Sequence, residues 1–121
     1  MGCTEVGVVA RRAVLLAGLL GALALAGCNK PAPAPKAATV TVTMADMAFQ
    51  PGTIDAHVGD TIHWVNKDLF EHTATASDQS FDVDLRAGAS GDTVLSKAGT
   101  IKVTCRFHPG MTALLRVADR G

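Results

Sequence analysis

The chain has 121 residues, with 11 Lys and Arg against 11 Asp and Glu, so its formal charge at pH 7 is zero. This length is enough for one domain, and the balanced charge excludes the broad basic surface that nucleic-acid binding requires. The hydrophobic fraction of 48% is raised by one apolar run near the N-terminus and therefore says little about the core.

The N-terminal segment has the layout of an export signal. Arg11 and Arg12 precede an apolar run over residues 13–27, which is shorter than the ~20 residues of a membrane-spanning helix. The run leads into Leu25-Ala26-Gly27-Cys28, which resembles a bacterial lipobox. This resemblance implies that residues 1–27 are a signal peptide removed by cleavage, and that the Cys28 sulfur then receives lipid. The alternatives are a plain secretory signal with a chance cysteine, and a twin-arginine signal, which the surrounding residues match poorly.

Residues 28–38 follow as a linker that is rich in Pro and Ala. Alternating prolines favour an extended polyproline conformation that rises ~3 Å per residue, so about ten residues would hold a domain ~30 Å from a membrane. We therefore expect an exported protein, anchored by lipid in the periplasm or at the cell surface. Asn29 favours the outer membrane, because an Asp at this position commonly retains lipoproteins in the inner membrane.

Residues 39–121 are predicted to form one all-β domain. Apolar and β-branched residues alternate with period two, and turn signals such as Gly59-Asp60 separate the alternating runs. No helical period is sustained beyond the leader, so seven or eight short strands in a β-sandwich are expected. The expected strands are 39–44, 54–58, 61–66, 72–75, 81–85, 92–96, 100–104 and 113–117.

The same alternation predicts which side chains fill the space between the sheets. His63 lies between Ile62 and Trp64 and is therefore expected to face solvent. Met44 and Met47 are interpreted as ordinary packing residues, with a second copper(I) site as the alternative. The expected inward set is Val40, Val42, Phe49, Ile54, Val58, Ile62, Trp64, Phe81, Val83, Val94, Ile101, Val103, Leu115 and Val117.

The cysteines point to one reactive thiol. Cys3 lies in the leader and Cys28 is expected to carry lipid, which leaves Cys105 as the one thiol of the expected domain. Exported proteins usually pair their cysteines in disulfides. A lone thiol in such a protein is therefore either an inert core residue or committed to chemistry or to a metal.

Cys105, His108 and Met111 occur three residues apart between two predicted strands. A loop can turn all three side chains toward one point, whereas a strand would place residues three apart on opposite faces. Thiolate and thioether favour copper(I), and trigonal His₂Cys coordination with a weak axial Met is the blue-copper arrangement. His72, at the start of a predicted strand, is the best candidate for the second imidazole. His57 and His63 are expected not to be ligands.

With this motif, residues 39–121 resemble a small cupredoxin of the amicyanin and plastocyanin group. The stretch from Phe49 to Val117 carries the likeness: residues 59–68 resemble the strand that leads to the upstream ligand, and Asn66 precedes His72 by six residues. Cys-x₂-His-x₂-Met is the short ligand loop of this group. The resemblance implies an eight-stranded Greek-key sandwich with one copper ion near one end. The implied ligands are His72, Cys105, His108 and Met111.

The resemblance also implies supporting residues around the ligands. The backbone N–H of Thr73 would donate to the sulfur of Cys105, and Asn66 would tie the ligand loop to its neighbour. His108 would reach the surface through an apolar patch for electron transfer. That patch would include Pro109, Gly110, Leu69 and Phe70.

The ligand loop departs from the amicyanin pattern at three positions. Arg106-Phe107 stands in place of Thr-Pro, and Gly110 stands in place of Phe. These changes leave the ligands intact. They bear on the hydrogen bond from the residue after Cys105 and on the shape and charge of the docking patch.

Because protein side chains fill all four positions, the expected site has no opening for a substrate. We therefore expect a monomeric electron carrier and not an enzyme, with one copper ion that cycles between Cu(I) and Cu(II) and passes electrons between redox protein partners. The main alternative is a copper carrier or sensor with the same ligands. A fragment of a copper oxidase or nitrite reductase would need more His than the four present, and Met is a poor ligand for structural zinc.

Overall fold

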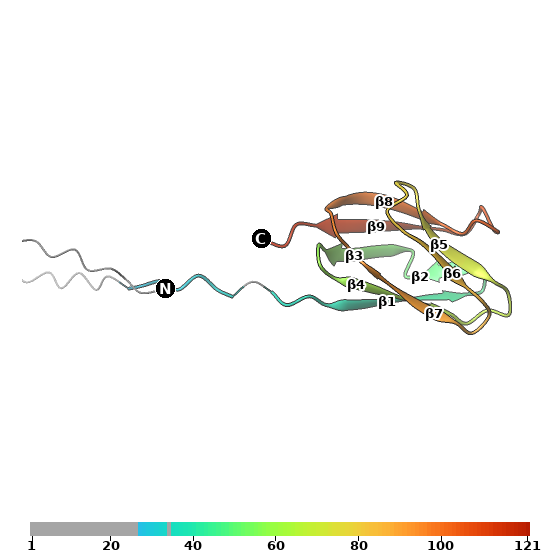
Figure 1. The fold of residues 1–121 in the computed structure, drawn as a ribbon, viewed down its shortest axis with the longest axis horizontal. Coiled ribbons are helices and arrows are strands. Elements are labelled where there is room, and N and C mark those ends of the chain that lie inside the picture. The colour runs from blue at the N-terminus through green and yellow to red at the C-terminus, as the bar shows by residue number, and fades with distance from the viewer. Residues whose placement is uncertain (1–26, 34) are drawn as a thin grey trace, which may run out of the picture. The chain divides into compact units, whose positions relative to one another are not determined.

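The computed structural model describes residues 27–33 and 35–121, and the account below concerns the compact unit that begins at Ala32 (Figure 1). The expected signal peptide lies outside the described residues except for Gly27, so its cleavage stays a prediction. Cys28 is exposed. In the described part of the chain, no helix is long and apolar enough to cross a bilayer.

Nine strands form two sheets that pack face to face, which confirms the predicted all-β sandwich. The strands are β1 (Thr39–Ala45), β2 (Ala48–Gln50), β3 (Thr53–His57), β4 (Thr61–Asn66), β5 (His72–Ala76), β6 (Asp82–Leu85), β7 (Ser90–Val94), β8 (Gly99–Thr104) and β9 (Thr112–Ala118). One sheet has the order β2-β1-β4-β7 and the other the order β3-β9-β8-β5-β6. The pairs β1–β4 and β3–β9 are parallel, and the other pairs are antiparallel.

Two strands differ from the sequence prediction by more than one residue at an end. Strand β2 was not predicted, because three residues are too few to show an alternating pattern. Strand β7 begins at Ser90 and ends at Val94, two residues earlier than the expected 92–96. Its first half is the Gly- and Ser-containing stretch that resembles a loop in sequence, and pairing with β4 holds this stretch extended.

Trp64 is the largest side chain of the core and is fully buried. Its ring centroid lies 6.1 Å from that of Phe49 and 5.8 Å from that of Phe81. The indole Nε1–H donates to the hydroxyl of Thr93 over 3.0 Å, because a buried indole needs an acceptor. Thr93 therefore faces inward and its neighbour Val94 faces outward, with 67% of its surface exposed. The prediction that Val94 belongs to the core is wrong for this reason.

The remaining residues of the expected inward set are buried or packed against the core, with Val40, Val58, Phe81 and Val83 only half-buried. Sequence alternation missed several buried positions, most of which are small or lie at strand ends. These are Ala56, Ala74, Ala76, Leu85, Leu95, Cys105, Met111 and Ala113. Met44 is buried, as expected for a packing residue, whereas the same expectation is wrong for Met47, which is exposed in the turn between β1 and β2.

Strand pairing places three chain segments together at one end of the sandwich. Strands β8 and β9 form an antiparallel pair joined by residues 105–111. Strand β5 pairs with β8, with Thr75 opposite Thr104, so the start of β5 lies beside the start of that loop. Figure 1 shows the β8–β9 loop at the end of the domain opposite the start of β1.

Candidate metal centre

Three potential metal-binding atoms converge at this end of the fold. The Nδ1 atoms of His72 and His108 lie 3.2 Å apart, and the Sγ atom of Cys105 lies 3.8 Å and 3.5 Å from them respectively. One ion could contact all three atoms at the bond lengths of about 2.0–2.3 Å that first-row metals make with nitrogen and sulfur. Among the described residues, this is the one group of His, Cys, Asp and Glu side chains that could hold a metal.

Each of the three residues is positioned by a different part of the fold. His72 is the first residue of β5 and is fully buried, so its ring is held by the core. Cys105 directly follows β8 and is also buried. His108 lies in the middle of the β8–β9 loop and is half-buried, which leaves it the most accessible of the three.

Met111 is buried and directly precedes β9. Its backbone closes the loop: the N–H of Cys105 donates to the carbonyl of Met111 over 3.1 Å, and the N–H of Met111 donates to the carbonyl of His108 over 2.8 Å. The loop is therefore a compact turn whose ends are fixed by β8 and β9. The role of Met111 as a fourth ligand stays a prediction.

The surroundings of Cys105 favour its thiolate form. Burial raises the pKa of the thiol, but hydrogen bonding to the sulfur, above all from the backbone N–H of Thr73, outweighs burial and brings the pKa down to about 6. The Thr73 N–H lies 3.4 Å from the sulfur, at the position that the cupredoxin resemblance implies. Because metals bind the thiolate, the pocket favours the form of Cys105 that would bind metal.

A hydrogen-bonded chain also fixes Arg106, the residue after the cysteine. Its N–H donates to the hydroxyl of Thr73 over 2.9 Å, and this hydroxyl lies 2.8 Å from that of Thr75. The guanidinium of Arg106 pairs with Asp82, at 3.0 Å, and with Asp84. The departure from Thr at this position therefore leaves the loop anchored, through a backbone donor and a surface ion pair.

Asn66 ties the β4–β5 loop to the end of β6, and its side-chain hydrogen bonds do not reach the ligand loop, although the resemblance implies that they would. Its side-chain amide donates to the carbonyls of Phe70 and Leu85, over 2.7 Å and 2.9 Å. Its side-chain oxygen accepts from the N–H of Asp68 over 2.9 Å. Asn66 is almost fully buried, so these bonds shape the loop that precedes His72.

The structure adds one contact that the sequence did not predict. Asp68 lies 2.8 Å from His72, through a carboxylate oxygen and the ring Nε2. This bond assigns the ring proton of His72 to Nε2 and leaves the Nδ1 lone pair free to face His108 and Cys105. Two imidazole nitrogens and a cysteine sulfur that converge on one point are a donor set that fits copper.

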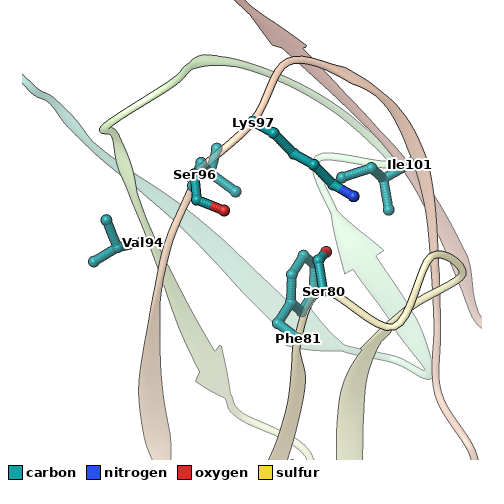
Figure 2. A pocket seen from close by; sticks show the side chains of 7 residues that line it. Ser80, Phe81, Val94, Ser96, Lys97 and Ile101 are labelled. Carbon is teal, nitrogen blue, oxygen red and sulfur yellow. The ribbon is translucent and has the colours of Figure 1, made fainter.

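The other histidines lie outside this cluster. The side chain of His57 is largely exposed, and His63 pairs with Asp92 on the outer face of the sheet, as expected for a solvent-facing residue. Phe81 and Ile101 are among the residues that line a hollow near the β7–β8 connection (Figure 2). Its volume is about 20 Å³. It has room for about one water molecule and contains no metal-binding group.

Comparison with known proteins agrees with the fold. A family model for the cupredoxin-like domain matches residues 17–116. The chain therefore belongs to the cupredoxin-like family.

Solved structures similar to this chain include copper proteins. A purple cupredoxin from Nitrosopumilus maritimus is 23% identical with a TM-score of 0.61, covering 65% of this chain and 99% of that chain. A copper(I) structure of an amicyanin mutant is 21% identical with a TM-score of 0.58, covering 65% and 81%. A copper-containing nitrite reductase from Thermus scotoductus is 29% identical with a TM-score of 0.60, covering 65% of this chain but 22% of that chain. The same fold thus also occurs as one part of a larger enzyme.

Proposed function

We propose that this protein carries single electrons on one copper ion held by His72, Cys105, His108 and Met111. The observation that carries the proposal is the convergence of two Nδ1 atoms and one sulfur within 3.2–3.8 Å of one another. Membership of the cupredoxin-like family and the low pKa of the thiol, about 6, support it.

Bound copper would supply a one-electron couple between Cu(II) and Cu(I). The contribution of the chain is to hold the donors still, because an electron moves more easily when the ligands rearrange little. His72 is buried and bonded through its far nitrogen, and the loop of Cys105 is closed by hydrogen bonds at both ends. No element of the proposed site has to open or close during the transfer.

Electrons would enter and leave near His108, the half-buried member of the cluster. Leu69 and Phe70, on the β4–β5 loop that precedes His72, are 90% and 61% exposed, and Phe107 beside His108 is also exposed. Together with Pro109 and Gly110 these residues form an apolar docking patch in the proposal. Such a patch suits brief contacts with redox protein partners, because it adds no strong charge that would slow release.

The proposal also places the protein outside the cytoplasm. Cys28 is exposed and is followed by the Pro- and Ala-rich linker, which suits a lipid anchor in a bacterial membrane and a monomeric domain held above it. Mass spectrometry of the mature protein, extracted from a membrane fraction, would test this part. Cleavage at a site other than Cys28, with no lipid, would contradict it.

Copper loading of the Cys105→Ser variant tests the copper site. Wild-type protein loaded with copper(II) is expected to show an intense visible thiolate-to-copper band, and Cys105→Ser is expected to abolish it. Cys28→Ser is the matched control, because it removes the other described thiol and should leave the band unchanged. A colourless copper-loaded wild type, or a band that survives in Cys105→Ser, would contradict the proposal.

A copper carrier is the alternative that one observation favours, since His108 is half-exposed and offers a route for metal exchange. The rate at which a chelator removes copper from the loaded protein distinguishes the two functions. Slow removal supports electron transfer, whereas removal within seconds supports a carrier.

A further inference from the structure

The carboxylate of Asp68 connects the proposed copper ligand His72 to a distant turn of the same domain. Its Oδ2 atom lies 2.8 Å from the Nε2 atom of His72 and accepts from the N–H of Met47 over 3.0 Å. Its Oδ1 atom accepts from the N–H of Asp46 over 2.8 Å. The Asp68 side chain is only 14% exposed and that of His72 is fully buried, so solvent competes little for the bond between these two side chains.

The β1–β2 turn is shaped to make these contacts. Asp46 and Met47 have φ angles of 51° and 59°, in the left-handed region that a two-residue hairpin turn requires. This backbone directs two successive N–H groups at the carboxylate. The three donors occupy both oxygens of Asp68, as suits an ionised carboxylate, which can only accept.

The bond to Asp68 determines which nitrogen of His72 can bind metal. The carboxylate accepts a hydrogen bond from the Nε2–H group of His72, so the neutral ring carries no proton at Nδ1. Nδ1 is the atom that faces Cys105 and His108. Carboxylate partners of metal-bound histidines generally fix the tautomer and the ring orientation and make the ligand more basic. Asp68 therefore orients His72 before any metal arrives.

The charge of Asp68 is also uncompensated by a basic side chain. In the described part of the chain, Asp68 forms an ion pair with His72 but with no Lys or Arg. A negative charge one imidazole away from a metal ion stabilises the more positive oxidation state, and partial burial limits the screening of this effect.

We propose that Asp68 is a positioning residue that fixes His72 for copper and lowers the reduction potential of the bound ion. The inference rests on the proposed function, because it concerns the ion that His72 would hold. It also makes the β1–β2 turn part of the metal centre, although no side chain of that turn is an expected ligand.

Asp68→Asn tests the inference, because the amide keeps an oxygen that can accept from His72 and Met47 but removes the charge. Glu71→Gln is the matched control: Glu71 directly precedes His72, carries the same charge and is exposed. The copper forms of both variants and the wild type are poised at one ambient potential, and the visible band gives the oxidised fraction. We expect the ratio of reduced to oxidised copper to rise about tenfold in Asp68→Asn, equivalent to about 59 mV for one electron. In Glu71→Gln it should change much less.

A shift in Asp68→Asn no larger than that in Glu71→Gln would overturn the inference while leaving the electron-transfer proposal intact. Failure of the proposed function would show differently, as a wild type without the visible band. Nitrogen NMR of the metal-free wild type tests the positioning role without copper and without any variant. A His72 ring with its proton on Nε2 supports the inference, and a proton on Nδ1 overturns it, whether or not Asp68→Asn folds.

Discussion

Two aspartates flank strand β4 and fasten opposite ends of the sandwich by similar means. Asp60 directly precedes the strand and accepts from the N–H groups of Ala38 and His57, each over 2.8 Å. Asp68 follows the strand and accepts two N–H groups from the β1–β2 turn. At each end of β4, one carboxylate thus binds a backbone N–H group that is more than twenty residues away along the chain: Asp60 binds that of Ala38, and Asp68 binds that of Asp46.

The third partner distinguishes the two ends. Asp60 pairs with the guanidinium of Arg120, and their side chains are 3% and 16% exposed. The permanent positive charge of the arginine therefore neutralises the negative charge of Asp60. Asp68 instead bonds the imidazole of His72. The carboxylate that pairs with an arginine therefore stabilises the fold, whereas the carboxylate that bonds a histidine orients a proposed metal ligand. Three changes test whether the ends are separable in this way.

The largest effect on stability is expected for Arg120→Ala at the end away from the metal centre. This change leaves the buried carboxylate of Asp60 without its cation and removes three donors to backbone carbonyls, so thermal unfolding should occur roughly 5–10 °C lower. The visible copper band should not change. Arg116→Ala is the control, because the Arg116–Asp55 pair is more than half exposed and should contribute little. A changed band in Arg120→Ala would show that the two ends are coupled.

A smaller and pH-dependent effect is expected for Asp60→Asn. The N–H groups of Ala38 and His57, together with Arg120, lower the pKa of Asp60 in the folded protein. Its stabilising contribution is therefore fully present above the unfolded pKa, near 3.9, and is lost as the pH falls through the lower folded value. The difference in urea midpoint between wild type and Asp60→Asn should be constant from pH 7 to about pH 5 and shrink below about pH 4. The exposed Asp119→Asn should show no such narrowing, and a gap that widens in acid would contradict the assignment.

The smallest effect on stability is expected for Met111→Leu, at the metal end. Leu and Met have similar volumes, so the free energy of unfolding of the metal-free protein should fall by less than about 1.5 kcal/mol. The reduction potential of the copper form should nevertheless rise, because a thioether donor to copper(II) is lost. Voltammetry of both proteins measures the shift. An unchanged potential would remove Met111 from the site.

The sequence was informative about the metal end because its donors carry their own chemistry. Cys105, His108 and Met111 stand at a fixed spacing between two strands, and His72 starts another strand. These residue types, with two sulfur donors among them, favour copper. The β-sandwich followed from the period-two pattern, which reports the burial of alternate side chains.

Sequence pattern could not reveal contacts that depend on where loops meet. Asp68 lies in an irregular loop, four residues before His72, and no sequence pattern distinguishes it from the exposed acidic residues of the domain. The pairing of Asp60 with Arg120 joins residues sixty positions apart. The outward turn of Val94 follows from the need of Trp64 for an acceptor, which is a property of the packed core and not of strand β7.

Arg120 also shortens the part of the linker that can separate the domain from a membrane. Its guanidinium holds the carbonyls of Pro35 and Lys36, each over 2.7 Å, so the linker is fastened from Pro35 onward. If Cys28 carries the lipid, seven residues, 28–34, separate the membrane from Pro35, and in a polyproline conformation at ~3.1 Å each they span roughly 22 Å. Strand β4 adds six residues, or about 20 Å, between the fastened end and the copper end. An electron donor or acceptor embedded in the same bilayer would therefore meet His108 at a height of up to roughly 40 Å above the lipid.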